Sequence, residues 1–233
     1  MSEKQEYFWA GVRAELPLLI GVFPFGMIYG ALAIDAGLSK PASQLMSSIV
    51  FAGSAQFVTT QLIKDSVPGF VIVLTIAVVN LRHIFYSASL APYVSSLSTP
   101  WKTLLSYLLT DEAYAPTVIH YEADGVKPHS HWFFFGAGLA LWTIWQISTG
   151  LGIFLGGAIP ESWSLDFALP LTFIAMVMPV LKNRAAIAAA LSAGLTSLLA
   201  HSLPYSLGLI LGALAGISAG ILFEAPNSRG GVK

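Results

Sequence analysis

The sequence has 233 residues and no cysteine. Disulfides, thiolate metal sites and S-acylation are therefore excluded. Charged residues are also scarce, because Asp, Glu, Lys and Arg make up only 10% of the chain, against about 25% in ordinary soluble domains. The net charge is −1 and the basic residues do not cluster, so we do not expect the chain to bind nucleic acid.

Apolar residues are abundant instead. They make up 55% of the chain, and the mean hydropathy is +0.73. No soluble fold of this length needs so much apolar material, so the composition predicts an all-α polytopic membrane protein with about eight transmembrane helices, some broken or kinked. We expect one transmembrane transporter domain at residues 16–223, between cytoplasmic segments at residues 1–15 and 224–233.

A spanning helix needs about 20 mostly apolar residues. The expected spans are residues 16–34, 42–63, 68–94, 101–120, 132–159, 167–181, 185–203 and 205–223. With both termini in the cytoplasm, only two of the loop and terminal basic residues, Lys40 and Lys102, lie outside. The inner side then holds Lys4, Arg13, Lys64, Lys127, Lys182, Arg184, Arg229 and Lys233, as the positive-inside rule requires. Seven spans remain possible if residues 42–63 are re-entrant.

Residues 42–63 are too polar to face lipid. Their polar side chains are Ser43, Gln44, Ser47, Ser48, Ser54, Gln56, Thr59, Thr60 and Gln61. This segment is therefore expected to be buried in protein and to be broken near Gly53. Interrupted helices of this kind are typical of transporter binding sites.

Asn80, Arg82 and His83 interrupt the apolar segment 68–94. An arginine at bilayer depth costs about 2.5–3.5 kcal/mol, so it normally faces a partner or water. At 100° per residue, Asn80 and His83 lie on the face opposite to Arg82. The helix is therefore either broken here or surrounded by protein.

Asp111 and Glu112 lie in the middle of residues 101–120. If this span is an antiparallel neighbour of residues 68–94, one of the two carboxylates can form an ion pair with Arg82 at similar depth. The alternative is that both carboxylates lie in a water-filled mouth of a tilted span.

Nucleotide-driven and enzymatic chemistry find no support in the sequence. Residues 21–26 have the glycine spacing of a phosphate loop, but Met27 replaces its lysine. Ser54 is a conceivable nucleophile with no specified base, and His129 and His131 lack a third metal ligand. We therefore predict no enzyme activity, cofactor or metal, and any pumping must use an ion gradient or an unseen partner.

Five motifs, in order along the chain, resemble the AzlC family, the large subunits of bacterial branched-chain amino-acid exporters. They are residues 24–30, 50–57, 80–92, 110–112 and 166–170. The resemblance covers about residues 10–222. It implies a secondary exporter of branched-chain, neutral apolar amino acids such as valine, coupled to protons. It also implies an inner-membrane location and a small membrane subunit of the AzlD type.

The residues suggest how such a substrate would be held. The predicted substrate-binding residues are Phe25, Gly53, Gln56, Phe57, Asn80 and Arg82. Arg82 and a helix break near Gly53 would bind the carboxylate, and Gln56 or an acidic residue would accept from the ammonium. Phe25 and Phe57 would wall the aliphatic side chain.

Three residues are predicted to couple protons or to form the ion pair: His83, Asp111 and Glu112. His83 is the natural carrier near neutral pH, although it could also form a purely structural hydrogen bond. Arg82 could equally be a static clamp between two helices. A passive channel, or a carrier for another small organic solute, is the alternative function.

Overall fold

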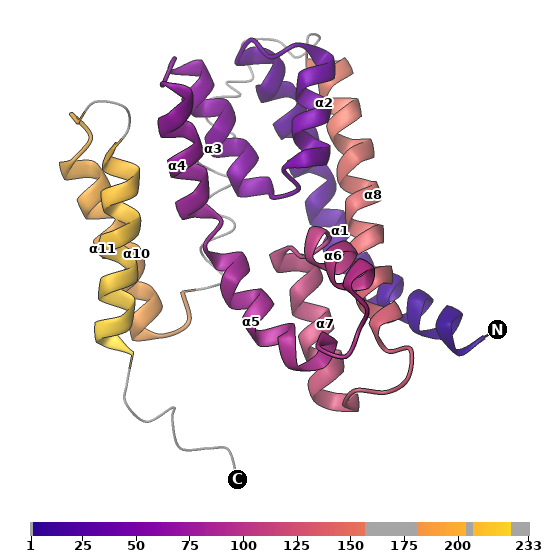
Figure 1. The fold of residues 1–233 in the computed structure, drawn as a ribbon. Helices are drawn as coiled ribbons and strands as arrows, with labels where there is room; N and C mark the ends of the chain where they lie inside the picture. Colours follow the sequence, from indigo (N-terminus) through magenta and orange to yellow (C-terminus); the bar gives the residue numbers. More distant parts are fainter. Residues whose placement is uncertain (1, 157–180, 204–206, 225–233) are drawn as a thin grey trace. The chain divides into compact units, whose positions relative to one another are not determined.

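The computed structural model describes residues 2–156, 181–203 and 207–224. Every regular element in these ranges is a helix, so the predicted all-α fold is confirmed. The chain divides into two compact units (Figure 1). Unit 1 comprises residues 1–64 and 80–165, and unit 2 comprises residues 65–79 and 166–233.

Unit 1 contains seven described helices. They are α1 (Glu3–Asp35), α2 (Lys40–Ile49), α3 (Gly53–Lys64), α5 (Arg82–Val94), α6 (Thr99–Tyr107), α7 (Asp111–Asp124) and α8 (His131–Leu155). Helix α1 is continuous from Glu3, so Leu16 marks no structural boundary. Within the part of the chain that the structure describes, three segments are long and apolar enough to cross a membrane: α1, α8 and residues 69–94.

Helices α1 and α8 run parallel in close contact. A side chain added at Gly11 would overlap the carbonyl of Phe133, and one at Gly30 would lie 2.8 Å from the amide nitrogen of Ile153. Residue numbers therefore rise together along both helices, and the contact depends on small residues. Gly26 and Gly30, four residues apart on α1, both lie against α8.

Helices α2 and α3 form a hairpin whose two ends both lie near the C-terminal end of α1. Tyr29 Oη of α1 donates to the Ser43 carbonyl of α2 at 2.9 Å. At the far end of α3, Lys64 Nζ lies 2.9 Å from Asp35 Oδ2, at the C-terminal end of α1. Residues 42–63 are thus re-entrant rather than a single crossing, since helices of 10 and 12 residues extend only about 15–18 Å.

Helices α6 and α7 form a second hairpin, whose two ends lie at the opposite end of unit 1. Trp101 of α6 packs edge-on against Trp132, with ring centroids 5.1 Å apart. His120 of α7 stacks on Phe133 at 4.0 Å. Both ends of this hairpin therefore lie at the N-terminal end of α8, and residues 101–120 are not one continuous span (Figure 1).

A helix cap explains the turn in this second hairpin. Thr110 is the N-cap of α7, and its hydroxyl accepts a hydrogen bond from the Ala113 amide at 3.3 Å. Asp111 and Glu112 follow in the first turn, where acidic side chains favour a helix start. Thr110-Asp111-Glu112 is a helix beginning, not the middle of a span.

The two hairpins change the expected distribution of charge. Lys64 lies beside Asp35 at the C-terminal end of α1, while Lys102 follows Trp101 at the N-terminal end of α8. Lys64 therefore lies at the same end of the unit as Lys40, and Lys102 at the same end as Lys4, which reverses the predicted grouping. The sidedness of the termini stays a prediction.

Unit 2 contains α4 (Gly69–Val79), α10 (Arg184–Leu199) and α11 (Leu207–Phe223). Side chains added at Gly212 or Gly216 of α11 would meet the α10 backbone at 2.8 and 3.0 Å. These two glycines, four residues apart, therefore pack against α10. The predicted span 167–181 and the turn at Pro204 lie outside the described residues.

Candidate functional site

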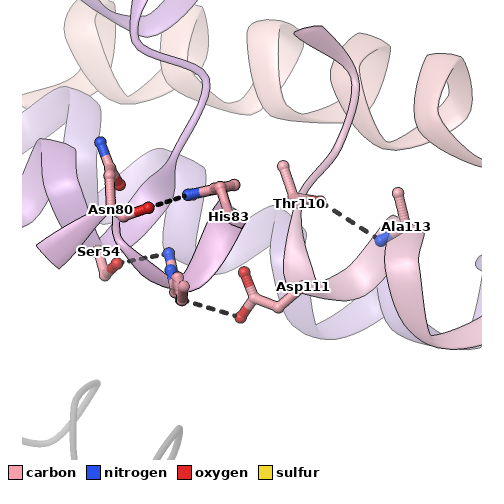
Figure 2. Close-up of polar contacts among 7 residues, drawn as sticks. Ser54, Asn80, His83, Thr110, Asp111 and Ala113 are labelled. Atoms are coloured by element: carbon pink, nitrogen blue, oxygen red, sulfur yellow. Dashed lines mark hydrogen bonds and ion pairs between the residues drawn. The ribbon is translucent and has the colours of Figure 1, made fainter. Parts of the chain in front are cut away.

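Asn80 and Leu81 form a turn between helix α4, which ends at Val79, and helix α5, which begins at Arg82. Of the two alternatives predicted for this segment, the break is the one observed. His83 Nδ1 lies 3.2 Å from the Asn80 carbonyl oxygen (Figure 2). The side-chain Oδ1 of Asn80 is buried and has no hydrogen-bond partner among the described residues, so the turn presents an unused acceptor.

Arg82 connects three helices. Its Nη1 lies 3.3 Å from Asp111 Oδ2 of α7, and its Nη2 donates to Ser54 Oγ of α3 at 2.6 Å. In Figure 2 these two contacts are the dashed lines that start at Ser54 and at Asp111. The Arg82 and Asp111 side chains are 24% and 33% exposed, and Arg82 Nε is buried without a hydrogen-bond partner among the described residues.

The ion pair forms in an arrangement different from the one expected. Tyr86 of α5 stacks on Tyr114 of α7 at 4.7 Å, and Tyr93 stacks on Tyr121 at 4.9 Å. Helices α5 and α7 therefore run parallel, not antiparallel, because α7 is the returning arm of a hairpin. Arg82 and Asp111 meet because both helices begin at the same height.

Three helix N-termini meet at Arg82. Ser54 is the second residue of α3, Arg82 the first of α5 and Asp111 the first of α7. A helix N-terminus carries unsatisfied N–H groups and a partial positive charge. The combination of these N-termini with a guanidinium favours the binding of an anionic group. The Asp111 carboxylate already compensates part of this positive charge.

Gln56 ties the turn between α2 and α3 to α8. Its Nε2 donates to the carbonyls of Ser47 at 3.2 Å and Val50 at 2.5 Å, and its Oε1 accepts from Trp145 Nε1 at 3.1 Å. Both amide hydrogens are thus directed to the hairpin. The two remaining predicted residues of this hairpin face the same core: Gly53 approaches Trp145, and Phe57 is buried edge-on to Tyr29.

Tyr107, which the sequence did not single out, joins the two hairpins. Its hydroxyl donates to the Ser48 carbonyl of α2 at 2.5 Å and accepts from Trp142 Nε1 of α8 at 2.7 Å. Its ring lies 6.2 Å from that of Phe51. No local pattern marks this residue, because its role depends on two hairpin turns meeting.

Glu15 is a second residue that sequence reasoning missed. It is fully buried in α1, and neither carboxyl oxygen has a hydrogen-bond partner in the described residues. The available signal was its spacing, because Glu15 shares the buried face of Gly11 and Val22 at helical intervals.

Phe25 is half-buried on α1. No group of three His, Cys, Asp or Glu side chains in the described ranges is arranged to hold a metal ion.

Broken helices and re-entrant hairpins packed within protein define a class, the multi-pass helical membrane proteins with interrupted segments. The chain belongs to the AzlC protein family, which matches residues 17–159. The resemblance stated from the sequence motifs is confirmed.

Similar proteins include three membrane proteins of bacteria and an archaeon. The inner membrane protein YgaZ of Escherichia coli K12 is 25% identical over 186 residues, covering 77% of this chain and 76% of its own. An uncharacterised membrane protein of Archaeoglobus fulgidus is 30% identical over 190 residues, covering 80% and 81%. The branched-chain amino acid transport protein AzlC of Bacillus subtilis is 26% identical over 179 residues, covering 74% and 69%. No solved structure matches the chain.

Proposed function

We propose that this protein is a secondary-active exporter of branched-chain amino acids such as valine, coupled to protons. It works in the bacterial inner membrane with a small AzlD-type subunit. The name of the Bacillus subtilis relative supports the substrate class, and the name of the Escherichia coli relative supports the inner membrane. The sequence resemblance is the basis for export, proton coupling and the partner.

The observation that carries the proposal is the meeting of three helix N-termini around Arg82. An amino acid presents a carboxylate and an ammonium a few ångströms apart. In our proposal Arg82 and the positive ends of these helices bind the carboxylate. Asp111, Glu112 and the unpaired Asn80 Oδ1 receive the ammonium.

The predicted aromatic residues complete the proposed site. Phe25, half-buried on α1, walls the aliphatic side chain of the substrate. Gly53 and Gln56 hold the hairpin turn in place, and Phe57 supports them from the core. These assignments make the turn of the first hairpin one side of the binding site.

Proton coupling in this proposal uses ionisable groups close to the substrate. His83 and Glu112 lie beside the Arg82–Asp111 pair, so proton uptake there changes the charge that the substrate meets. The described residues form opposed hairpins with meeting turns, an arrangement suited to alternating access by small movements of one hairpin.

The test is export of a panel of labelled amino acids from cells with and without the small subunit, with the proton gradient collapsed in parallel. We expect valine, leucine and isoleucine to be exported, and export to stop when the gradient collapses. A carrier also shows trans-stimulation by unlabelled substrate, whereas a channel does not. If the variants Arg82→Lys and Asp111→Asn both exported valine at the wild-type rate, the assignment of the binding site would be wrong.

A further inference from the structure

Glu15 is a buried acid without a partner. Among the described residues it is the only carboxylic acid with both oxygens buried and without a hydrogen-bond donor. Its side chain is fully inaccessible to solvent. A lone carboxylate in such surroundings costs several kcal/mol, so a native chain keeps it only with a proton or another compensating positive charge.

The surroundings of Glu15 contain little to neutralise it. Helix α8 has no titratable side chain after His131, and the titratable residues of α2 and α3, Lys40 and Lys64, lie at the far end of the unit beside Asp35. Arg13 is exposed and, two positions away, points to the other side of α1.

Helix α7 runs antiparallel beside α1, because Tyr7 of α1 lies 5.8 Å from His120 of α7 between ring centroids. Glu15 and Glu112 lie equally far along their helices from this contact, so they come to the same height. The neighbouring Asp111 is engaged by Arg82 of α5 at 3.3 Å. Glu15, Asp111 and Glu112 thus supply three carboxyl groups against one guanidinium. An additional positive charge is needed when all three are ionised.

The missing charge is best supplied by a proton. A metal cation requires several oxygen ligands, and no suitable group of three occurs in the described ranges. A proton requires no coordination sphere, and two neighbouring carboxyl groups can share one proton where both cannot be charged.

We propose that Glu15 and Glu112 form a carboxyl pair that takes up and releases the transported proton. This inference rests on the proposed function. When the substrate ammonium reaches Asp111 and Glu112, its charge replaces that of the proton, which leaves to the aqueous side then open. When the substrate departs, the pair binds a proton again. One proton is thereby exchanged for one substrate, and the carboxyl groups face one added positive charge in both states, the proton in one and the ammonium in the other.

The test uses Glu15→Gln in the full chain, reconstituted with its small subunit in vesicles. Glutamine keeps the shape of the protonated acid but cannot exchange a proton. We expect valine accumulation driven by a pH gradient to fall about tenfold or more. Valine exchange without a gradient should persist, because Glu15 does not touch the substrate. Wild-type accumulation by this variant would overturn the proposal.

The matched control is Glu6→Gln, because Glu6 is an exposed acid on the same helix. Both activities of this control should equal those of the wild type. An equal loss of accumulation in Glu6→Gln would also overturn the assignment, since the effect would then follow from removing any acid from α1.

A second measurement does not depend on transport. Infrared difference spectra of the wild type should show the carbonyl band of a protonated carboxyl group that disappears as the pH is raised, and Glu15→Gln should lack that band. An unchanged band in the variant would overturn the proposal. If the wild type neither accumulates nor exchanges amino acids, the proposed function fails, while the infrared titration still decides whether Glu15 binds a proton.

Discussion

At the scale of single residues, Arg82 shows how a charge is accommodated at depth. Its two terminal nitrogens contact different helices, one reaching Asp111 and the other Ser54. The planar guanidinium allows both contacts at once, whereas a lysine ammonium offers a single point of charge. The geometry of Arg82, and not only its charge, therefore holds the first turns of α3, α5 and α7 together.

The first prediction follows from this geometry. Arg82→Lys should insert normally but export valine about tenfold more slowly, which corresponds to ~1.4 kcal/mol of lost stabilisation. Initial export rates from loaded vesicles measure the effect. The control is Arg13→Lys, because Arg13 is exposed on α1, and that variant should keep the wild-type rate. Equal rates for both variants would show that Arg82 needs only its charge.

At the scale of elements, the pairing of α1 with α8 depends on the absence of side chains. Gly11 and Gly30 lie directly against the backbone of α8, which allows close van der Waals packing where lipid gives no hydrophobic driving force. Gly21, on the same helix, has open space around it. One helix therefore contains both crowded and uncrowded glycines.

Gly30→Ala should destabilise the protein by about 1–3 kcal/mol, because the added methyl group overlaps the α8 backbone. Gly21→Ala should be neutral or slightly stabilising, since alanine favours a helix by about 1 kcal/mol over glycine. Thermal unfolding of the two variants in detergent provides the comparison. Equal melting temperatures would contradict the parallel α1–α8 contact.

The re-entrant course of α2 and α3 is also a property of elements. Asp35 and Lys64 lie at the same end of unit 1, with their side chains in contact. If residues 42–63 crossed the membrane, these two residues would be about 30 Å apart. The hairpin and the crossing thus differ by a distance that a chemical cross-linker can measure.

Since the chain has no cysteine, paired cysteines can be introduced without background. Asp35→Cys with Lys64→Cys should be joined by a short bifunctional maleimide, with the product identified by peptide mass spectrometry. Asp35→Cys with Lys127→Cys is the control pair and should not be joined. The reverse pattern would contradict the hairpin.

At the scale of the molecule, the described lysines of unit 1 separate into two groups. Lys40 and Lys64 lie at the C-terminal end of α1. Lys102 and Lys127 lie near the N-terminal end of α8, at the same end as the first turn of α1, which contains Lys4. The greater positive charge at this end favours a cytoplasmic N-terminus.

Single cysteines that replace Lys40, Lys64, Lys102 and Lys127 should therefore be labelled in two groups. In intact cells, a membrane-impermeant maleimide should modify Lys40→Cys and Lys64→Cys. Lys102→Cys and Lys127→Cys should react only after the membrane is permeabilised. Labelling of Lys64→Cys only from the inside would restore the single crossing first expected for residues 42–63.

The sequence alone was enough to predict the helical membrane class, the long helix α8 and the part of α1 after residue 15, and it left a break at Asn80 as one of two alternatives. These features are local, because apolar run length and mid-span polar groups are properties of a segment by itself. The Arg82–Asp111 contact was also anticipated as one of two alternatives, since an arginine at depth needs a partner.

Only the tertiary structure decided the direction of the half-length helices and the burial of Glu15. A polar, interrupted segment has the same sequence pattern whether it crosses the membrane or turns back. The reason is that neighbouring helices, not its own residues, provide the partners for its polar backbone and side-chain groups. Glu15 looked like part of a charged N-terminal segment until the packing of α1 placed it inside the protein. Glu112, nearly a hundred residues away in sequence, comes to the same height on the adjacent helix α7, a proximity that folding alone creates.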